Sequence, residues 1–212
     1  HFGLQALWTL ALGLLAVFVV GSQSRGAALA LLLSVLAMPI YCRDQRARII
    51  AATALVLAML TFWLLEPLVM ARGASYRPEI FMSSLHMIAE RPWGGLGVAA
   101  DYRITSHGRT FDHAHNLFSH VTIQLGLPGL LLWCIVWFAV LREAWCARDS
   151  LLGRGVLGMW VFSFLAMQFD AASLTGTPRA EWFITWLPIG LAGVLTWARA
   201  NSGGCDKIPR SS

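Results

Sequence analysis

Apolar residues gather along this chain in long, nearly uninterrupted runs that short polar segments separate. A helix needs roughly 20 mostly apolar residues to cross the hydrocarbon layer of a membrane. None of the runs alternates polar and apolar residues, as a spanning β-strand would. We therefore expect an all-α fold, a polytopic transmembrane helical bundle of about six spans. The predicted spans are residues 4–20, 26–42, 49–70, 117–141, 151–169 and 182–198.

The composition excludes an ordinary soluble domain. Apolar residues make up 57% of the 212-residue chain and charged residues only 13%, about half of the roughly 25% that soluble domains carry. The net charge of +5 does not indicate a nucleic-acid partner, because membrane proteins concentrate Lys and Arg in cytoplasmic loops. We expect a multi-pass protein that contacts membrane lipids and binds no nucleic acid.

The basic residues predict the orientation of the spans. Spans alternate in direction, so segments 43–48 and 142–154 and the segment from residue 199 onward share one side, and each contains three basic residues. Short basic loops favour the cytoplasm. The turn 21–26, the loop 71–116 and the turn 170–181 should then face outward.

The chain divides into four parts on this pattern. Residues 1–70 hold three spans, residues 71–116 form the outer loop, residues 117–200 hold three more spans, and residues 201–212 form a disordered cytoplasmic tail. The loop is too long to be a bare connector, and loops of this length are usually functional. We expect it to carry the functional residues.

The first part of the loop, residues 77–90, predicts a helix. Pro78 suits its first turn, and Phe81, Leu85 and Ile88 recur at helical spacing to form one apolar face. This pattern is typical of an amphipathic helix that lies on a membrane surface.

A glycine-rich stretch follows Arg91 and Pro92, with Gly94, Gly95 and Gly97 within four positions. Such glycines allow a tight turn or let the backbone approach a ligand closely. The stretch is not a phosphate loop, because no Gly-Lys-Ser/Thr follows.

Histidines are concentrated near the end of the loop. The sequence Asp112-His113-Ala114-His115-Asn116 precedes the fourth span. Imidazole can take a proton near neutral pH, and Asp112 or Asn116 would orient it. Two other hypotheses remain open. The pair could be interfacial histidines hydrated by water or lipid headgroups, or two ligands of a metal whose other ligands lie elsewhere.

Arg25 lies in the tight outer turn between the first two spans. Its guanidinium can grip a phosphate with two parallel hydrogen bonds. The alternative is an arginine that only reaches to the membrane interface. Since an outward Arg opposes the usual orientation bias, we favour a functional reason.

Taken in order, these residues resemble the O-antigen ligase family, whose superfamily also contains O-antigen polymerases and some protein O-oligosaccharyltransferases. The resemblance covers roughly residues 15–141 and rests on three features. They are Ser24-Arg25-Gly26 at the end of a span, Arg77 leading a loop helix that ends in Arg91-Pro92-Trp93-Gly94-Gly95-Leu96-Gly97, and His115-Asn116 followed by a glycine-containing span. Family members are usually about twice this long, so we expect the chain to be a C-terminal portion.

The resemblance implies a glycosyltransferase of the bacterial inner membrane with its active site on the periplasmic side. It would take a glycan from an undecaprenyl-pyrophosphate-linked donor and pass it to a lipid A core acceptor; the polymerase and protein-glycan branches use other acceptors. The implied catalytic residues are His115, Arg25 and Arg77, and the implied substrate-binding residues are Arg91, His113, Asn116, Gly95 and Gly97.

Physical chemistry supports these roles. Charge builds on a pyrophosphate as it leaves, and arginines can stabilise that charge without a metal or cofactor. An attacking hydroxyl must lose its proton, and His115 is the best candidate base. A transporter fragment that uses Arg25 and Glu66 would carry its charges within spans, and a metal-dependent hydrolase is a third hypothesis.

Overall fold

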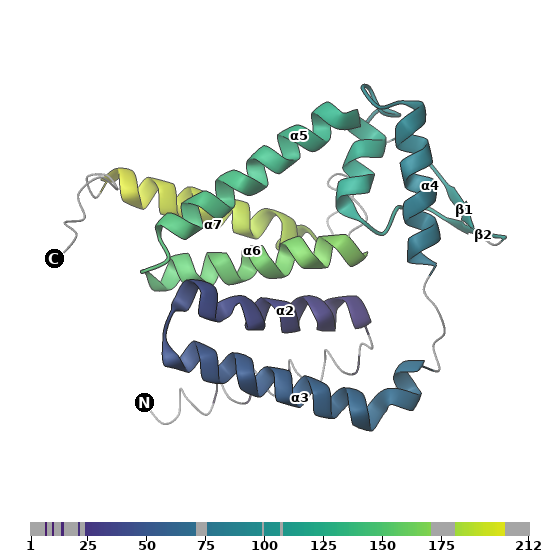
Figure 1. Ribbon diagram of the computed structural model, residues 1–212. Coiled ribbons are helices and arrows are strands. Elements are labelled where there is room, and N and C mark those ends of the chain that lie inside the picture. The colour runs from purple at the N-terminus through teal and green to yellow at the C-terminus, as the bar shows by residue number, and fades with distance from the viewer. Residues whose placement is uncertain are drawn as a thin grey trace.

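The computed structural model of the protein describes residues 7, 10, 14, 21, 24–70, 76–98, 100–106, 108–170 and 181–201. Its described elements are labelled as in Figure 1. The long helices are α2 (Arg25–Cys42), α3 (Gln45–Met70), α5 (Leu117–Cys146), α6 (Leu151–Asp170) and α7 (Glu181–Asn201). A shorter helix, α4 (Arg77–Glu90), and two strands, β1 (Ile104–Ser106) and β2 (Arg109–Phe111), lie between α3 and α5 in the sequence.

The five long helices have the length and apolar composition to cross a membrane. They coincide with the second to sixth predicted spans, so the all-α polytopic bundle is confirmed for this part of the chain. The predictions for residues 4–20, apart from 7, 10 and 14, lie outside the described residues, as do those for the turn 171–180 and the tail from 202.

Helix α2 lies between α3 and α6 (Figure 1). Its residues Gly26, Ala30 and Ser34 are buried at four-residue intervals. Small side chains at this spacing let two spanning helices approach closely. Ser34 Oγ also donates a hydrogen bond to the carbonyl of Gly158 in α6 at 3.1 Å. The small-residue pattern of α2 therefore sets its close contact with α6.

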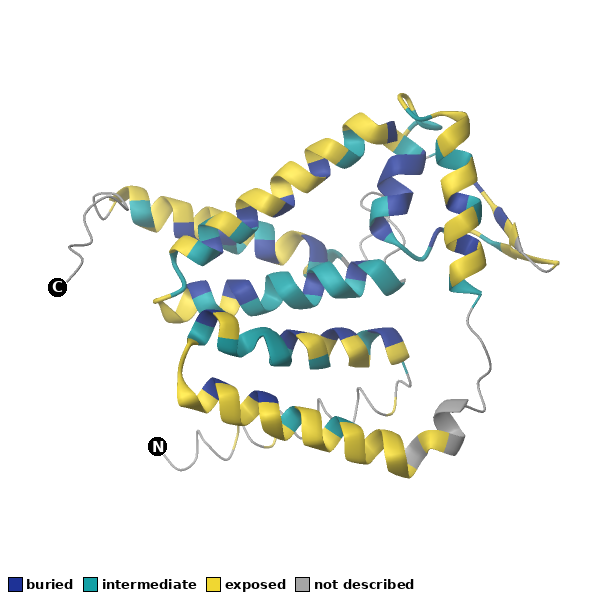
Figure 2. Cartoon of the chain, viewed as in Figure 1, coloured by how far each residue is buried: buried dark blue, intermediate teal, exposed yellow. Residues whose placement is uncertain are grey.

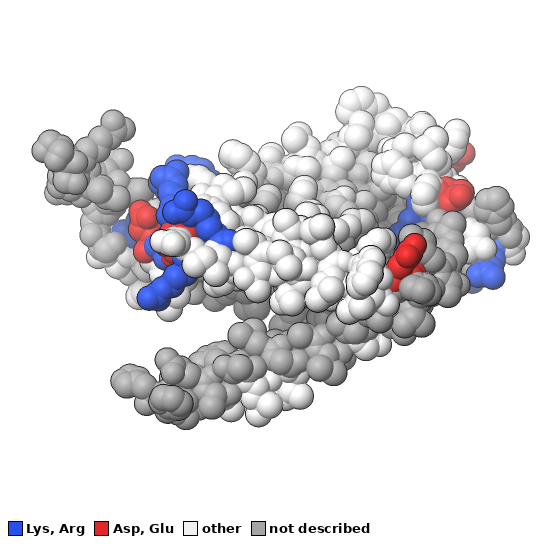
Figure 3. All heavy atoms as spheres, turned by 60° about the horizontal axis from the view of Figure 1, so that its bottom comes forward, with Lys and Arg blue, Asp and Glu red and all other residues white. Residues whose placement is uncertain are grey.

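Charged residues gather at two ends of the molecule, and the face in Figure 3 shows an uncharged band between them. The α2–α3 connection, the α5–α6 connection and the end of α7 lie together at one end, which we call the basic end (Figure 1). Helix α4 and the two strands lie at the opposite end, the loop end. The described basic segments therefore share one side, as predicted, and the cytoplasmic location of that side stays a prediction.

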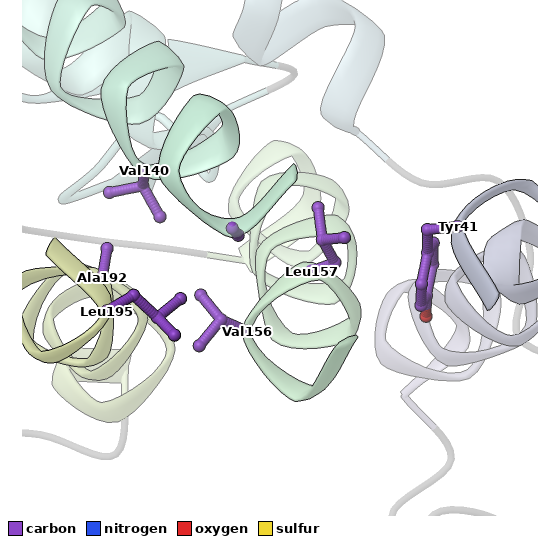
Figure 4. Close-up of a cluster of buried hydrophobic side chains, with 7 residues drawn as sticks. Tyr41, Val140, Val156, Leu157, Ala192 and Leu195 are labelled. Carbon is purple, nitrogen blue, oxygen red and sulfur yellow. The ribbon is translucent and has the colours of Figure 1, made fainter. Parts of the chain in front are cut away.

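Ion pairs and apolar packing join the helices near the basic end. Glu143 of α5 accepts hydrogen bonds from Arg142 at 2.8 Å and from Arg199 of α7 at 2.7 Å. Arg154, which interrupts the fifth predicted span, also lies here, with Nη1 3.9 Å from the carboxylate of Asp44. The helices surround a buried cluster (Figure 4) of Tyr41, Val140, Ala144, Val156, Leu157, Ala192 and Leu195.

Much of the remaining helix surface is exposed (Figure 2) and carries large apolar side chains. Trp63 of α3 is 74% exposed and Phe138 of α5 is 67% exposed. Lipid is the solvent that such a surface requires, because in water an apolar area of this extent would be strongly unfavourable.

Helix α5 differs from the uninterrupted span predicted for residues 117–141. It breaks at Gly126, where φ is 69° and ψ is −173°, and Pro128 has no N–H to continue the helical ladder. The half before the break is largely buried within the loop end. The half after it, residues 127–146, extends about 30 Å at 1.5 Å per residue, which matches the hydrocarbon thickness.

Helix α4 has the predicted bounds and runs across the direction of the spans (Figure 1). Its buried residues are Ile80 and Ser84, whereas Phe81 and Leu85 are 44% and 42% exposed. The protein core therefore uses Ile80 and Ser84, which the apolar pattern did not single out, together with Ile88 of the predicted face. Phe81 and Leu85 are exposed, and their contact with a membrane surface stays a prediction. Ile80 packs in a cluster with Tyr102, Ile104, Ala114 and Ile123.

Strands β1 and β2 form an antiparallel hairpin that the sequence interpretation did not anticipate. Ile104 pairs with Phe111, and Ser106 pairs with Arg109. Gly108, with φ 73°, lies in the turn, and a glycine in a two-residue turn is a common hairpin signal. The hairpin brings Tyr102, which precedes β1, close to the histidine segment that follows β2.

Candidate active site

Asp112, His113 and His115 form a chain of hydrogen bonds between β2 and α5. His113 Nδ1 lies 2.6 Å from Asp112 Oδ1, and His113 Nε2 lies 3.0 Å from His115 Nδ1. An ionised carboxylate only accepts hydrogen bonds, so His113 Nδ1–H is the donor. In neutral His113 the Nε2 atom then accepts, and His115 Nδ1–H donates to it. This arrangement leaves the basic lone pair on His115 Nε2.

The carboxylate at the end of this chain remains ionised over a wider pH range than an ordinary aspartate. The hydrogen bond from His113 lowers the pKa of Asp112. The Asp112 side chain is 89% exposed, so water screens its charge strongly. It orients His113 by direct contact more than by a long-range field.

His115 has a backbone conformation that non-glycine residues seldom adopt, with φ 50°. The left-handed region costs roughly 1–2 kcal/mol, so the neighbouring residues must hold it there. On the N-terminal side, the Ala114 N–H donates to the hydroxyl of Tyr102 at 3.2 Å. On the C-terminal side, Asn116 is fixed as the N-cap of α5. Such strained residues cluster at functional sites.

Asn116 connects the histidine segment to two helices. Its Oδ1 accepts a hydrogen bond from the Ser119 N–H at 3.0 Å, which makes Asn116 the N-cap of α5. Its Nδ2 donates to Oε1 of Gln168 in α6 at 3.0 Å. Both ends of the amide are therefore engaged in holding structure, and the predicted contact of Asn116 with substrate stays a prediction.

Arg77 and Arg25, 52 positions apart in the sequence, are brought together at the loop end. Arg25 is the first residue of α2, and the Ser24 hydroxyl caps this helix. A Cβ atom placed on Gly26 would lie only 3.3 Å from Nη1 of Arg77. The Arg77 guanidinium therefore lies against the first turn of α2, where the helix dipole adds further positive potential.

The end of α6 joins the arginine pair to the histidine pair. Gln168 contacts Asn116, and the next residue, Phe169, packs against Gly26 so closely that an added Cβ would lie 2.7 Å from the Phe169 Cβ. Two consecutive residues of α6 thus support both sets of candidate catalytic groups. His86 is exposed on α4 and His107 lies outside the described residues.

The glycine-rich stretch packs on the break in α5. The N–H groups of Leu96 and Gly97 donate to the carbonyls of Ile123 and Gln124, at 2.8 and 2.9 Å. These carbonyls are available because the helix ladder is interrupted. The N–H of Leu127 in turn donates to the carbonyl of Pro92 at 2.7 Å.

Gly95 and Arg91 also take part in this packing. Gly95 has φ 61°, and a Cβ there would lie 2.5 Å from the backbone of Gln124. Arg91 is the C-cap of α4, and its carbonyl accepts the Gly95 N–H at 3.1 Å. Substrate binding by Arg91, Gly95 and Gly97 stays a prediction.

Three residues around the site were missed by sequence reasoning: Tyr102, His120 and Gln168. Burial raises the pKa of Tyr102 to about 12, so its hydroxyl keeps its proton and can donate. Tyr102 Oη lies 2.7 Å from Nδ1 of His120 in the first part of α5. A histidine or glutamine at the end of an apolar run could have indicated such a residue, because polar side chains there need partners.

Among the described residues, no three His, Cys, Asp or Glu side chains are placed to hold a metal ion. The histidine pair is engaged with Asp112 and with itself. A reaction without a metal or cofactor stays a prediction.

Fold and site together define a polytopic α-helical membrane protein that places a hydrogen-bonded histidine pair, and Arg77 beside the first turn of α2, at one end of its spans. The O-antigen ligase family model matches residues 10–134, and the chain belongs to that family. A curated O-antigen ligase of Pseudomonas aeruginosa (strain ATCC 15692) is 30% identical over 189 residues, which are 89% of this chain and 47% of that relative. The chain thus spans about half the length of the curated relative. No solved structure matches it.

Proposed function

We propose that this protein is a membrane glycosyltransferase that moves a glycan from undecaprenyl pyrophosphate to the lipid A core, on the periplasmic side of the bacterial inner membrane. The observation that carries the proposal is the position of the Arg77 guanidinium against Gly26 in the first turn of α2, the turn that begins at Arg25. Membership of the O-antigen ligase family supports the same reaction class.

The arginines act on the leaving group. As the bond between the anomeric carbon and the phosphate oxygen breaks, negative charge builds on the pyrophosphate. Arg25 and Arg77 carry permanent positive charges and present several N–H donors each. Donors fixed in place before the reaction stabilise developing charge without reorganisation.

His115 acts on the acceptor. The acceptor hydroxyl oxygen forms the new bond to the anomeric carbon and gives its proton to Nε2 of His115. The imidazolium keeps its Nδ1–H bond to His113, and Asp112 balances the added positive charge through His113. The products are the glycosylated acceptor and polyprenyl pyrophosphate.

Helix α4 provides the contact with the lipid-linked donor. It runs across the ends of the spans (Figure 1) and exposes Phe81, Met82 and Leu85. An apolar face in this orientation lies in the headgroup layer, where a polyprenyl carrier presents its pyrophosphate. The transporter hypothesis, in contrast, requires Glu66 on a solute path. Glu66 is exposed on α3, which does not favour that hypothesis.

The test is to express the gene that encodes this chain in a strain that lacks its O-antigen ligase and to examine its lipopolysaccharide on a gel. Long-chain lipopolysaccharide should return with the wild type. It should be absent with Arg77→Ala and poorly restored by Arg77→Lys, because an ammonium lacks the planar fork of guanidinium.

The matched control is Arg103→Ala, which removes an exposed arginine of the same loop. Full activity of Arg77→Ala would remove this residue from the site, and longer carrier-linked glycan or glycosylated protein without lipopolysaccharide would indicate another branch of the superfamily.

A further inference from the structure

A buried pair of polar residues, Tyr102 and His120, lies directly behind the histidine segment. The two residues are only 7% and 5% exposed. Tyr102 Oη lies 2.7 Å from His120 Nδ1 and accepts the N–H of Ala114 at 3.2 Å. Ala114 is the residue between His113 and His115, and it is itself 4% exposed.

The polarity of these hydrogen bonds follows from their chemistry. The Tyr102 oxygen accepts from Ala114, so its own O–H is free to donate to Nδ1 of His120. His120 then carries its proton on Nε2, and that atom has no partner among the described side chains and backbone. Burying such a polar pair is costly, and apolar residues of similar shape would fill the space at less cost. The arrangement therefore points to a requirement other than packing.

That requirement is the conformation of His115. The residue has φ 50°, and its ring must remain 3.0 Å from His113 Nε2. To keep this conformation, the backbone on each side of His115 has to be fixed. Asn116 fixes the C-terminal side through Ser119 and Gln168. On the N-terminal side the Tyr102 hydroxyl fixes the backbone, because it accepts a hydrogen bond from the Ala114 N–H.

We propose that Tyr102 and His120 are positioning residues that hold the Ala114 backbone so that His113 and His115 stay hydrogen-bonded and His115 Nε2 is the basic atom. The inference rests on the proposed function of His115 as general base. Neither residue touches substrate; Tyr102 acts through Ala114, and His120 acts by orienting the Tyr102 hydroxyl.

The first readout does not depend on activity. Protein labelled with ¹⁵N-histidine in lipid nanodiscs is examined by NMR, which reports the protonated nitrogen of each ring, with assignments from single histidine variants. We expect a fixed Nδ1–H tautomer for His115 in the wild type and its loss in Tyr102→Phe. The matched control is Tyr41→Phe, which removes one hydroxyl from another buried tyrosine (6% exposed) near the basic end. It should leave the His115 tautomer unchanged.

The second readout is glycan transfer by the same samples. A displacement of about 1 Å in a reacting group can cost about 10²-fold in rate, so kcat of Tyr102→Phe should fall by up to about 10²-fold with little change in KM for the donor. His120→Leu should behave like Tyr102→Phe. His120→Asn should restore much of the rate, because its amide oxygen can accept the Tyr102 O–H in place of Nδ1.

The outcomes separate the two hypotheses. A retained His115 tautomer in Tyr102→Phe, an equal loss in Tyr41→Phe, or no difference between His120→Leu and His120→Asn would overturn the positioning role. Loss of the tautomer in Tyr102→Phe, together with a wild type that transfers no glycan, would support the positioning role and overturn the proposed function. Melting temperatures identify any variant that fails to fold, and His120→Asn then provides the decisive comparison.

Discussion

Gly26→Ala is expected to disturb the arginine pair without touching either arginine. The added methyl carbon would lie 2.7 Å from Phe169 Cβ and 3.3 Å from Arg77 Nη1. Carbon atoms in good contact are about 3.5–4.0 Å apart. Helices α2 and α6 would therefore have to separate by about 1 Å at the loop end, and the Arg77 guanidinium would be displaced from the first turn of α2.

The cost to stability and the cost to catalysis should differ in size. An extra methyl in a closely packed site costs about 1–3 kcal/mol, partly offset by the gain of up to about 1 kcal/mol for alanine over glycine in a helix. Domains are stable by about 5–15 kcal/mol, so the variant should remain folded. A 1 Å displacement of a catalytic group, in contrast, can cost about 10²-fold in rate.

The assay compares the rate of glycan transfer and the melting temperature of purified variants in liposomes. Gly155→Ala is the matched control, because it lies in α6 and its Cβ would meet nothing within 4 Å. It should keep the wild-type rate and be slightly more stable. A wild-type rate for Gly26→Ala, or an equal loss of rate for Gly155→Ala, would refute the proposed packing of Arg77 on α2.

Three further predictions concern the histidine pair and the topology. His115→Ala should lower the transfer rate by about 10²- to 10⁴-fold and His113→Ala by less; the reverse order at several pH values would exchange their roles. The pKa of Asp112 is lowered by the hydrogen bond from His113, so the stability it contributes is present above its ordinary pKa and is lost as the pH falls below about 4. Acid unfolding monitored by circular dichroism should show that Asp112→Asn lacks this part of the loss of stability at low pH. The same loss of stability in Asp112→Asn as in the wild type would contradict the prediction. In a cysteine-free background, Ser106→Cys should react with an impermeant thiol reagent added outside the inner membrane and Gln45→Cys should not; the opposite pattern would reverse the orientation.

The spans were predictable from the sequence because the membrane leaves few alternatives. Lipid cannot satisfy backbone hydrogen bonds, so a long apolar run has to be a helix. The bounds of α4 and the N-cap at Asn116 were also predictable, since both depend on local residue chemistry that acts within a few positions.

The break in α5 was not predictable in the same way. Gly126 and Pro128 are tolerated in many spanning helices that remain nearly straight. The break is stable here because the N–H groups of Leu96 and Gly97, about 30 positions earlier, satisfy the carbonyls that it frees. A pattern read along the chain does not contain that pairing.

The candidate site was likewise predictable from the sequence only in part. The residue types of His115, Arg25 and Arg77 indicated their chemistry, whereas their positions depend on contacts between distant helices. Gly26 has to be a glycine beside Phe169 before Arg77 can reach α2. The roles of Tyr102 and Gln168 follow only from hydrogen bonds across 12 and 52 positions.

The docking of the glycine-rich stretch on the break in α5 has a consequence for how the protein sits in its membrane. The 30 residues of α5 exceed the roughly 20 that a span needs, so hydrophobic length alone would allow this helix to slide along the membrane normal. The turn bonded to Ile123 and Gln124 is polar backbone that cannot enter hydrocarbon. We expect it to stop the helix at Gly126 and to leave the preceding turns, which follow the histidine segment, above the lipid. We therefore expect two backbone hydrogen bonds to set the height of His115 over the bilayer, so that this height changes little with the thickness of the membrane.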